Sequence, residues 1–321
     1  MRDKDEGGSP LLDYLELVRL PNIFTAIADV AMGFLFVQVA GDDEQTWHIH
    51  WSDGRILLLL AATSSLLYAA GVVLNDVADV DIDRNERPKR PIPSGRILLA
   101  TARRFGWLLL LLGVAVAWIV PLLSGQLRTG LIGSLLAACI VLYDMGLKRT
   151  ILGPVAMGGC RTLNVLLGMS VLAGPFQPQH WLVAAAIGVF VAGITWFARN
   201  ESDEQSNRLQ LLGATVLMLA GIGLLAYLPH WGEDLVGLQG LESWQWPLVM
   251  GLLGLMIGGR CFLAVSDPTP ERVQIAVTHA IMSLVILDAA ACFAARGAPW
   301  AIAVVALIFP TMSLGRFFES T

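Results

Sequence analysis

Ten long apolar runs constrain the fold of this chain more than any other feature. Each is long enough to cross a hydrocarbon core of about 30 Å as a helix, and no segment outside them is long enough to form a soluble domain. Charged residues make up 15% of the 321 residues, whereas soluble proteins carry roughly a quarter. We therefore expect an all-α, multi-pass integral membrane protein with nine to ten spans. The runs cover residues 21–40, 55–75, 103–122, 129–145, 154–173, 181–199, 209–228, 245–265, 273–295 and 299–315.

The residues before the first run follow a different pattern. Leucines alternate with charged residues over 11–20, which predicts a short amphipathic helix at the membrane interface. The chain then divides into an interfacial segment, residues 1–20, and one transmembrane domain, residues 21–315. The last apolar run is short, so it is either a half-span or a helix that lies flat on the membrane.

The basic residues predict the orientation. With the N-terminus in the cytoplasm, all but four of the 21 Lys and Arg residues fall in cytoplasmic segments. The exceptions are Arg55, Arg128 and Arg296 on the other side, and Arg161 inside a span. Because cytoplasmic loops are rich in Lys and Arg, we expect the N-terminus and the charged loops in the cytoplasm, at a bacterial inner membrane. The same asymmetry favours an even number of crossings.

A cluster of acids stands at the end of the second apolar run. Asp76, Asp79 and Asp83 are spaced by about one and two helical turns, which predicts that they share one helix face. Like charges repel, and carboxylates at a membrane boundary are incompletely hydrated. Divalent cations would relieve this repulsion, and oxygen ligands suit Mg²⁺ bound together with a phosphate-bearing substrate. The alternative is a solvated, charged loop between two spans.

A second polar segment repeats part of this pattern four spans later. Asn200-Glu201-x-x-Glu204 matches Asn75-Asp76-x-x-Asp79, and each ends a span. We therefore expect two pseudo-repeated four-helix halves, with their acidic faces opposed across a central cavity. The repeat fails at its third position, where an arginine replaces the last acid. Taken alone, this second segment reads as an ordinary polar loop.

Basic residues near both segments predict a diphosphate ligand. Arginine holds phosphate oxygens bidentately, and cations with bases stabilise the charge on departing diphosphate. In a lipid-lined cavity the matching organic part is an isoprenoid chain, and a dry cavity protects the allylic carbocation until an electron-rich acceptor captures it. The candidate phosphate contacts are Arg87, Lys89, Arg90, Lys148 and Arg199.

The loop after the fourth run adds further candidates. Lys148 and Arg149 are either phosphate contacts or markers of membrane topology. Tyr143 either stacks on the acceptor or is an interfacial aromatic anchor. Asn22 lies where the first span begins at the cytoplasmic mouth, so it is a candidate substrate contact, as is Asn200.

These motifs resemble those of a known family. Asn75-Asp76-x-x-Asp79-x-x-x-Asp83, followed by Arg87-Pro88-Lys89-Arg90-Pro91, is similar to the first signature of the UbiA superfamily of intramembrane prenyltransferases. The order of motifs and spans over about residues 15–265 is similar too. The resemblance implies an all-helical bundle, usually of nine spans, with a Mg²⁺-diphosphate site beneath a cytoplasmic cap. It also implies that Asn75, Asp76, Asp79 and Asp83 are metal ligands, and that Arg87, Arg90 and Lys148 contact the diphosphate and act in catalysis.

The second signature departs from the family pattern. The family reads Asp-x-x-x-Asp, whereas this chain has Glu201 at the first position and Gln205 at the second. Asp203 or Glu204 would then complete the ligand set with Glu201. The phrase Phe197-Ala198-Arg199-x-Glu201 resembles a UbiA-like branch of ebo-type biosynthetic clusters.

The predicted activity is transfer of an isoprenoid chain from a polyprenyl diphosphate to a small lipophilic, electron-rich acceptor, with Mg²⁺ as cofactor and no role for nucleic acid. Three alternatives remain. A UbiA-like protein with an altered second motif could bind a prenyl lipid without turnover. A transporter would use the acids as an ion path, although such acids recur near span midpoints. A lipid-alcohol phosphotransferase would show an Asp-Gly-x-x-Ala-Arg motif, which this sequence lacks.

Ionisable residues inside the apolar runs are a separate signal, because isolated charges in membranes are costly and often functional. They are Asp29, Arg161, His279 and Asp288. An ion pair of Asp29 or Asp288 with Arg161 that locks helices, and contact with substrate, fit the sequence equally well.

The four cysteines stand singly in apolar runs, without the spacing of a metal site. We expect them to be small buried hydrophobic residues and not disulfides or zinc ligands. They are Cys139, Cys160, Cys261 and Cys292.

Overall fold

The computed structural model describes residues 9–38, 51–200, 207–232 and 235–315, and all regular structure within these ranges is helical. The all-α prediction is therefore confirmed. Each predicted apolar run contains a helix. The long helices are α2 (Leu20–Val37), α3 (Trp51–Ala78), α5 (Leu99–Ser124), α6 (Arg128–Asp144), α7 (Gly153–Met169), α8 (Pro178–Phe197), α9 (Arg208–Ala226), α10 (Gln245–Ser266) and α11 (Pro270–Arg296).

Eight segments of the described chain are long and apolar enough to cross a membrane. Seven of them fall on α2, α3, α5, α8, α9, α10 and α11, and the eighth covers 298–315. This last segment consists of two helices of 8 residues each, α12 (Ala298–Val305) and α13 (Ile308–Gly315). The helices α6 and α7 have 17 residues each.

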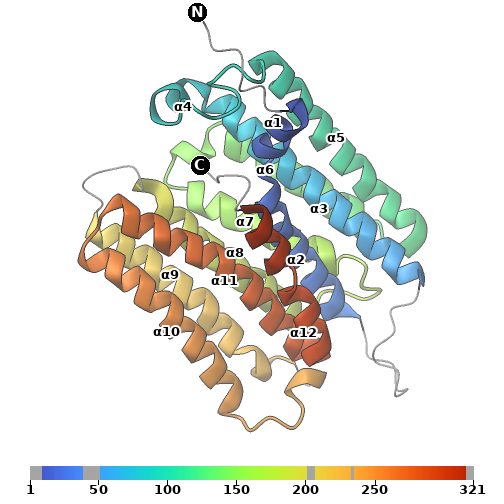
Figure 1. Cartoon of the computed structure of the whole chain (residues 1–321). Helices are drawn as coiled ribbons and strands as arrows, with labels where there is room; N and C mark the ends of the chain where they lie inside the picture. The colour runs from blue at the N-terminus through green and yellow to red at the C-terminus, as the bar shows by residue number, and fades with distance from the viewer. Residues whose placement is uncertain (1–8, 39–50, 201–206, 233–234, 316–321) are drawn as a thin grey trace, which may run out of the picture.

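Short helices lie at the end of the bundle where the chain begins (Figure 1). The predicted interfacial helix is α1 (Pro10–Leu17), and α4 (Val80–Glu86) follows α3 almost without interruption. Single 3-10 turns follow α6 (Leu147–Arg149) and α8 (Ala198–Asn200). We refer to this region as the α4 end of the bundle.

Consecutive long helices pack against one another around the bundle. The described contacts run from α2 to α3, α5, α6, α7, α8, α9, α10 and α11, and α11 returns to α2. Within this circuit α2 also packs against α7, so it lies near the centre (Figure 1). Burial agrees, because 72% of the α2 span is buried against 28% for α5 and 22% for α10. The helices α5 and α10 therefore present apolar side chains to the lipid.

The close crossing of α2 and α7 depends on two glycines. A Cβ atom on Gly33 would collide with the carbonyl oxygen of Val165, and one on Gly168 would collide with that of Val30. Small residues let membrane helices approach closely. This crossing brings the polar residues of α2 and α7 within hydrogen-bonding distance.

The cysteines differ from the prediction in two respects, the first of which is that Cys139 is only half-buried. All four are free thiols, as expected, but they do not all stand alone. The sulfur atoms of Cys139 in α6 and Cys160 in α7 lie 3.3 Å apart. The sequence alone does not predict this contact, because the two cysteines are 21 residues apart. It arises because α6 and α7 form an antiparallel pair across a short loop.

Candidate functional site

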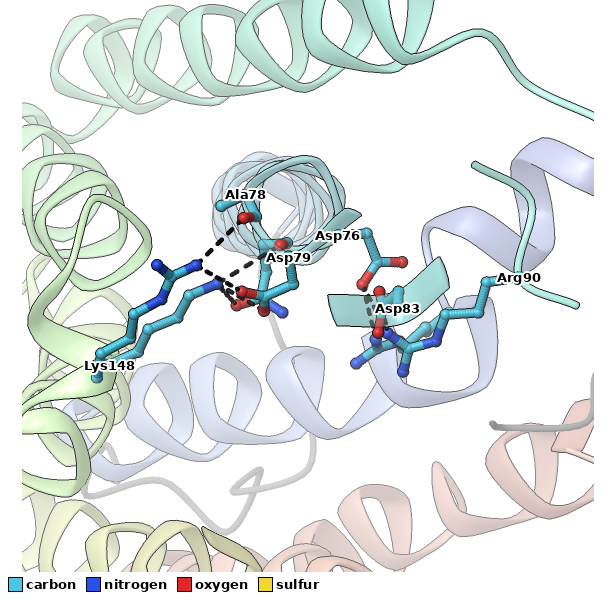
Figure 2. Close-up of polar contacts among 9 residues, drawn as sticks. Asp76, Ala78, Asp79, Asp83, Arg90 and Lys148 are labelled. Atoms are coloured by element: carbon cyan, nitrogen blue, oxygen red, sulfur yellow. Dashed lines mark hydrogen bonds and ion pairs between the residues drawn. The ribbon is translucent and has the colours of Figure 1, made fainter. Parts of the chain in front are cut away.

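The acids of the first motif lie at the α4 end, where α3 breaks. The helix α3 ends at Ala78 and α4 begins at Val80, with Asp79 as the residue before α4. The backbone of Asp79 (φ −101°, ψ 6°) is not α-helical, so the prediction of one continuous helix face for the three acids is wrong. The break separates the acids into two clusters on different sides of the helix end (Figure 2).

The first cluster joins Asp76 and Asp83 through a shared arginine. Arg90 Nη1 lies 2.8 Å from Asp83 Oδ2 and 3.4 Å from Asp76 Oδ1. Arg19 Nη2 donates to the same Asp76 oxygen at 2.9 Å. Asp76, Asp83 and Arg90 are all buried. Two carboxylates and two guanidinium groups therefore form a compact, charge-balanced cluster directed into the protein.

A proline-rich turn places Arg90 in this cluster. After α4 the chain folds back, with Ser94 N donating to Arg90 O and Ile97 N donating to Pro91 O at 3.0 Å each. Gly95 closes the turn with φ +79°, a backbone conformation that favours glycine. Burial lowers the pKa of Arg90 from its ordinary value, and the positive charge of Arg19 beside it acts in the same direction. Because the ordinary pKa is so high, Arg90 stays charged at neutral pH.

The second cluster joins Asp79 to the loop between α6 and α7. Lys148 Nζ lies 2.7 Å from Asp79 Oδ2 and 2.8 Å from Asn75 Oδ1. Arg149 Nη2 makes longer contacts, 3.4 Å to the carbonyl oxygen of Ala78 and 3.5 Å to Asp79 Oδ1. The loop thus supplies two positive charges to one carboxylate (Figure 2).

Two residues near the clusters were not among the predicted site residues. Arg19 was counted with the cytoplasmic bases but was given no role at the site, yet it contacts Asp76 and is the one described non-glycine residue with positive φ (48°). Its position directly before Leu20-Pro21, the start of α2, was an available signal. Asp144, at the end of α6, has a buried Oδ2 atom without a hydrogen-bond partner in the described structure. It lies within electrostatic range of Lys148 and Asp79.

The remaining predicted contacts surround the two clusters more loosely. Arg87, Lys89 and Arg199 are exposed, whereas Asn22 and Tyr143 are half-buried. Tyr143 is within electrostatic range of Asp79 and of Arg199, so the end of α8 lies near the second cluster. The Asn200 side chain and the acids Glu201, Asp203 and Glu204 lie outside the described residues.

The described acids do not form a ready metal cage. No group of three or more His, Cys, Asp or Glu side chains converges on one point among the residues that the structure places. The donor chemistry nevertheless suits Mg²⁺, which prefers carboxylate and amide oxygens, and Asp144 contributes an unpartnered carboxylate oxygen nearby. In the structure, bases of the same chain balance the carboxylates.

Comparison with known proteins gives one family. The model of the UbiA prenyltransferase family matches residues 39–319. The digeranylgeranylglyceryl phosphate synthase of Methanoculleus marisnigri is 32% identical over 245 residues, which cover 74% of this chain and 85% of that protein. The protoheme IX farnesyltransferase of Methylorubrum extorquens is 28% identical over 246 residues, or 69% of this chain and 73% of that protein.

Solved structures show the same fold. One from work on digeranylgeranylglyceryl phosphate synthase in membranes superposes with a TM-score of 0.61 at 21% identity and covers 93% of this chain and all of the other. A UbiA homolog from Archaeoglobus fulgidus bound to GPP and Mg²⁺ gives a TM-score of 0.58 at 15% identity, over 92% of this chain and 99% of the other.

Proposed function

Because the chain belongs to the UbiA prenyltransferase family, we propose that its α4 end binds the diphosphate of a prenyl donor together with Mg²⁺. The chain is an integral membrane prenyltransferase, an enzyme that transfers an isoprenoid chain. The observation that carries the proposal is the inward packing of Asp76, Asp79 and Asp83 against bases from three other segments of the chain.

The cation would be held by the oxygens of the first motif. Asn75, Asp76, Asp79 and Asp83 supply the carboxylate and amide ligands that Mg²⁺ prefers. Asp76 and Asp79 would exchange part of their pairing with bases for the cation. When bound, Mg²⁺ acts as a Lewis acid that neutralises charge on the departing diphosphate. Further ligands are proposed on Glu201, Asp203 and Glu204.

The bases would then serve the diphosphate. Arg90 and Lys148 are the strongest candidates, because both are held within 3 Å of a motif carboxylate and carry donors suited to phosphate oxygens. Arg87, Lys89 and Arg199 are exposed at the same end and can reach outer phosphate oxygens. In this proposal the same donors alternate between carboxylate and phosphate partners.

The organic substrates follow from the surroundings of the site. A UbiA homolog with this fold has been solved with GPP and Mg²⁺ bound, which supports a polyprenyl diphosphate as the donor. Cleavage of its C–O bond gives an allylic carbocation, and an apolar bundle keeps water from that cation. A small lipophilic, electron-rich acceptor would capture it, with Asn22, Tyr143, Arg149 and Asn200 as proposed substrate contacts.

The proposal includes an orientation. Most Lys and Arg residues of the chain fall in segments that the sequence assigns to one side, and cytoplasmic loops are rich in these residues. The α4 end would therefore face the cytoplasm, at a bacterial inner membrane, where a soluble diphosphate product can leave.

The test is donor turnover by the purified protein in detergent or nanodiscs. Farnesyl diphosphate and geranylgeranyl diphosphate are supplied with Mg²⁺ or with EDTA, and released pyrophosphate and donor binding are measured. We expect binding and slow pyrophosphate release that both require Mg²⁺. Tight donor binding without any release, even with a panel of lipophilic aromatic acceptors, would instead identify a protein that binds prenyl lipids without turnover. Absence of donor binding would reject the proposal.

A further inference from the structure

A groove runs along the outer side of the bundle between α9 and α10, which pack side by side away from α4 (Figure 1). Its volume is about 660 Å³, within the range of about 300–1,000 Å³ that is typical of ligand pockets. Along α9 it extends from Leu212 to Ala226, or about 21 Å at 1.5 Å per residue. The groove therefore follows most of a hydrocarbon core that is about 30 Å thick.

The groove is apolar along its length. Among the described residues that line it, Thr215 alone has a polar side chain, and its hydroxyl donates to the carbonyl oxygen of Leu211 at 2.7 Å. The lining residues Leu255 and Phe262 are 73% and 64% exposed, so covering them would bury apolar surface. An occupant of this elongated space is therefore a hydrocarbon chain.

Glycines keep the groove open. A Cβ atom on Gly223 of α9 or on Gly251 of α10 would meet no neighbouring atom within 4 Å, so these glycines do not serve the close helix packing that small residues usually permit in membranes. On Gly254 or Gly258, a Cβ atom would lie 3.6 Å from Leu219 Cδ2 of the opposite wall. A flexible chain can follow this uneven floor, whereas a helix with a diameter of about 10–12 Å cannot.

A positive charge stands at one end of the groove. Arg208 is the first residue of α9 and is exposed. It lies about one helical turn before Leu212, which lines the groove, so the two residues share a face of α9. Asp267, just after α10, pairs with Arg272 at 2.8 Å, so the charge of that acid is already balanced. An arginine at the end of a membrane helix reaches the lipid headgroups, where it can hold phosphate oxygens bidentately.

We infer that the groove between α9 and α10 binds one anionic phospholipid of the surrounding membrane, with a hydrocarbon chain along the glycines and the phosphate on Arg208. One arginine matches the single negative charge of a phosphodiester. A prenyl diphosphate carries more charge, and it meets several bases at the acid motif instead. The lipid site is separate from that motif and does not depend on the proposed function.

Photolabelling with a matched pair of lipids tests the site. The purified full chain is placed in phosphatidylcholine nanodiscs with a trace of phosphatidylglycerol or phosphatidylcholine that carries a diazirine in its acyl chain, and labelled residues are mapped by peptide mass spectrometry. We expect adducts on the groove residues of α9 and α10 to exceed those on α5, which is similarly exposed to lipid. The phosphatidylglycerol probe should label the groove about fivefold more, the effect expected for one arginine beside an anionic headgroup.

Variants separate the headgroup contact from the chain contact. Arg208→Gln should remove the preference for phosphatidylglycerol but keep the chain adducts. Gly251→Leu places a side chain in the open space of the groove and should lower the adducts of both probes several-fold. Gly223→Leu fills the opposite wall and should do the same. Arg104→Gln, which replaces an exposed arginine near the start of α5, should leave the labelling of the groove unchanged.

Other outcomes would overturn the inference. Equal labelling of α5, α9 and α10 would show that the groove holds ordinary bulk lipid only. A preference for phosphatidylglycerol that survives in Arg208→Gln, or that Arg104→Gln also removes, would reject the arginine as the headgroup contact. Displacement of the adducts by farnesyl diphosphate would make the groove a donor site, and protection from both probes in a dimeric protein would assign it to a second copy. Mg²⁺-dependent donor binding is measured on the same nanodiscs, and its absence would reject the proposed function alone.

Discussion

Lys148 Nζ lies 2.7 Å from Asp79 Oδ2 and 2.8 Å from Asn75 Oδ1. This contact ties the loop between α6 and α7 to the end of α3, although the residues are far apart in sequence. The lysine is held in place by two oxygen partners in a largely buried setting. In the proposed function it needs little reorganisation to reach a phosphate oxygen, so it is positioned before the donor arrives.

Replacing Lys148 should therefore affect activity more than replacing its neighbour. The Lys148 side chain is 9% exposed and that of Arg149 is 62% exposed. Solvent therefore screens the charge of Arg149 far more than that of Lys148. We expect Lys148→Met to weaken donor use by on the order of 100-fold and Arg149→Met by only a few-fold. The measurement is kcat/KM for the donor at saturating Mg²⁺. Equal effects in the two variants would contradict the distinction.

Asp76 should be essential for Mg²⁺-dependent turnover. Asp76→Asn keeps the shape of the side chain but removes the charge that binds Arg19, Arg90 and the proposed cation. We expect at least a 100-fold loss of pyrophosphate release and a higher Mg²⁺ requirement. Asp81→Asn is the matched control, since Asp81 lies in α4 with its side chain 86% exposed. Wild-type activity in Asp76→Asn would overturn the site assignment.

Arg96 should hold α1 against the turn that carries Arg90. It donates to Glu16 at 2.6 and 2.8 Å, to Asp13 at 2.5 Å and to the carbonyl oxygen of Lys89 at 2.8 Å. We expect Arg96→Gln to raise the rate of proteolysis and hydrogen exchange in α1, and Arg84→Gln, an exposed arginine in α4, to leave both unchanged.

The pH dependence of this contact follows from Arg96. The hydrogen bonds from Arg96 to Glu16 raise the pKa of the arginine above its ordinary value. Stability from a raised basic pKa is complete below the ordinary pKa of arginine and is lost only at strongly alkaline pH. The exchange protection of α1 should therefore stay constant as the pH rises from neutral to mildly alkaline. A decline over that range would show that another group controls the contact.

The sequence was most informative where one property repeats along the chain. Every apolar run predicted a helix, because the cost of exposing polar backbone in lipid leaves few alternatives. The acid motif indicated the candidate site through residue type and spacing. The geometry of the acids could not be predicted from the sequence. The helix breaks at Asp79, and Arg19, Arg90 and Lys148 reach the acids from distant segments. The pairing of Asp29 with Arg161 similarly depends on how α2 and α7 cross.

The contact between Cys139 and Cys160 gives a direct test of how α6 packs on α7. Their sulfur atoms are 3.3 Å apart, so a small movement allows a disulfide, which needs about 2 Å. We expect mild oxidation of membranes with copper phenanthroline to link these two cysteines, detected by mass spectrometry of the joined peptides. Cys261 and Cys292 serve as internal controls that should remain free. Absence of the link, with the thiols shown to be accessible to oxidant, would contradict this packing.

The ion pair between Arg161 and Asp29 should contribute to stability mainly through the cost of breaking it. Asp29 is fully buried and accepts from Arg161 at 2.6 Å. Arg161→Met leaves that carboxylate without its cation, which typically costs about 3–5 kcal/mol, whereas replacing both partners of a buried pair with apolar residues is often neutral. Asp288 in α11 is fully buried and interacts electrostatically with both residues, so it has to be replaced together with them. We therefore expect Arg161→Met to unfold at much lower SDS than the wild type, and Asp29→Leu/Arg161→Met/Asp288→Leu to recover most of the loss. If the triple variant is as unstable as the single one, the charged residues do not act as a unit, and the crossing of α2 and α7 depends on Gly33 and Gly168 instead.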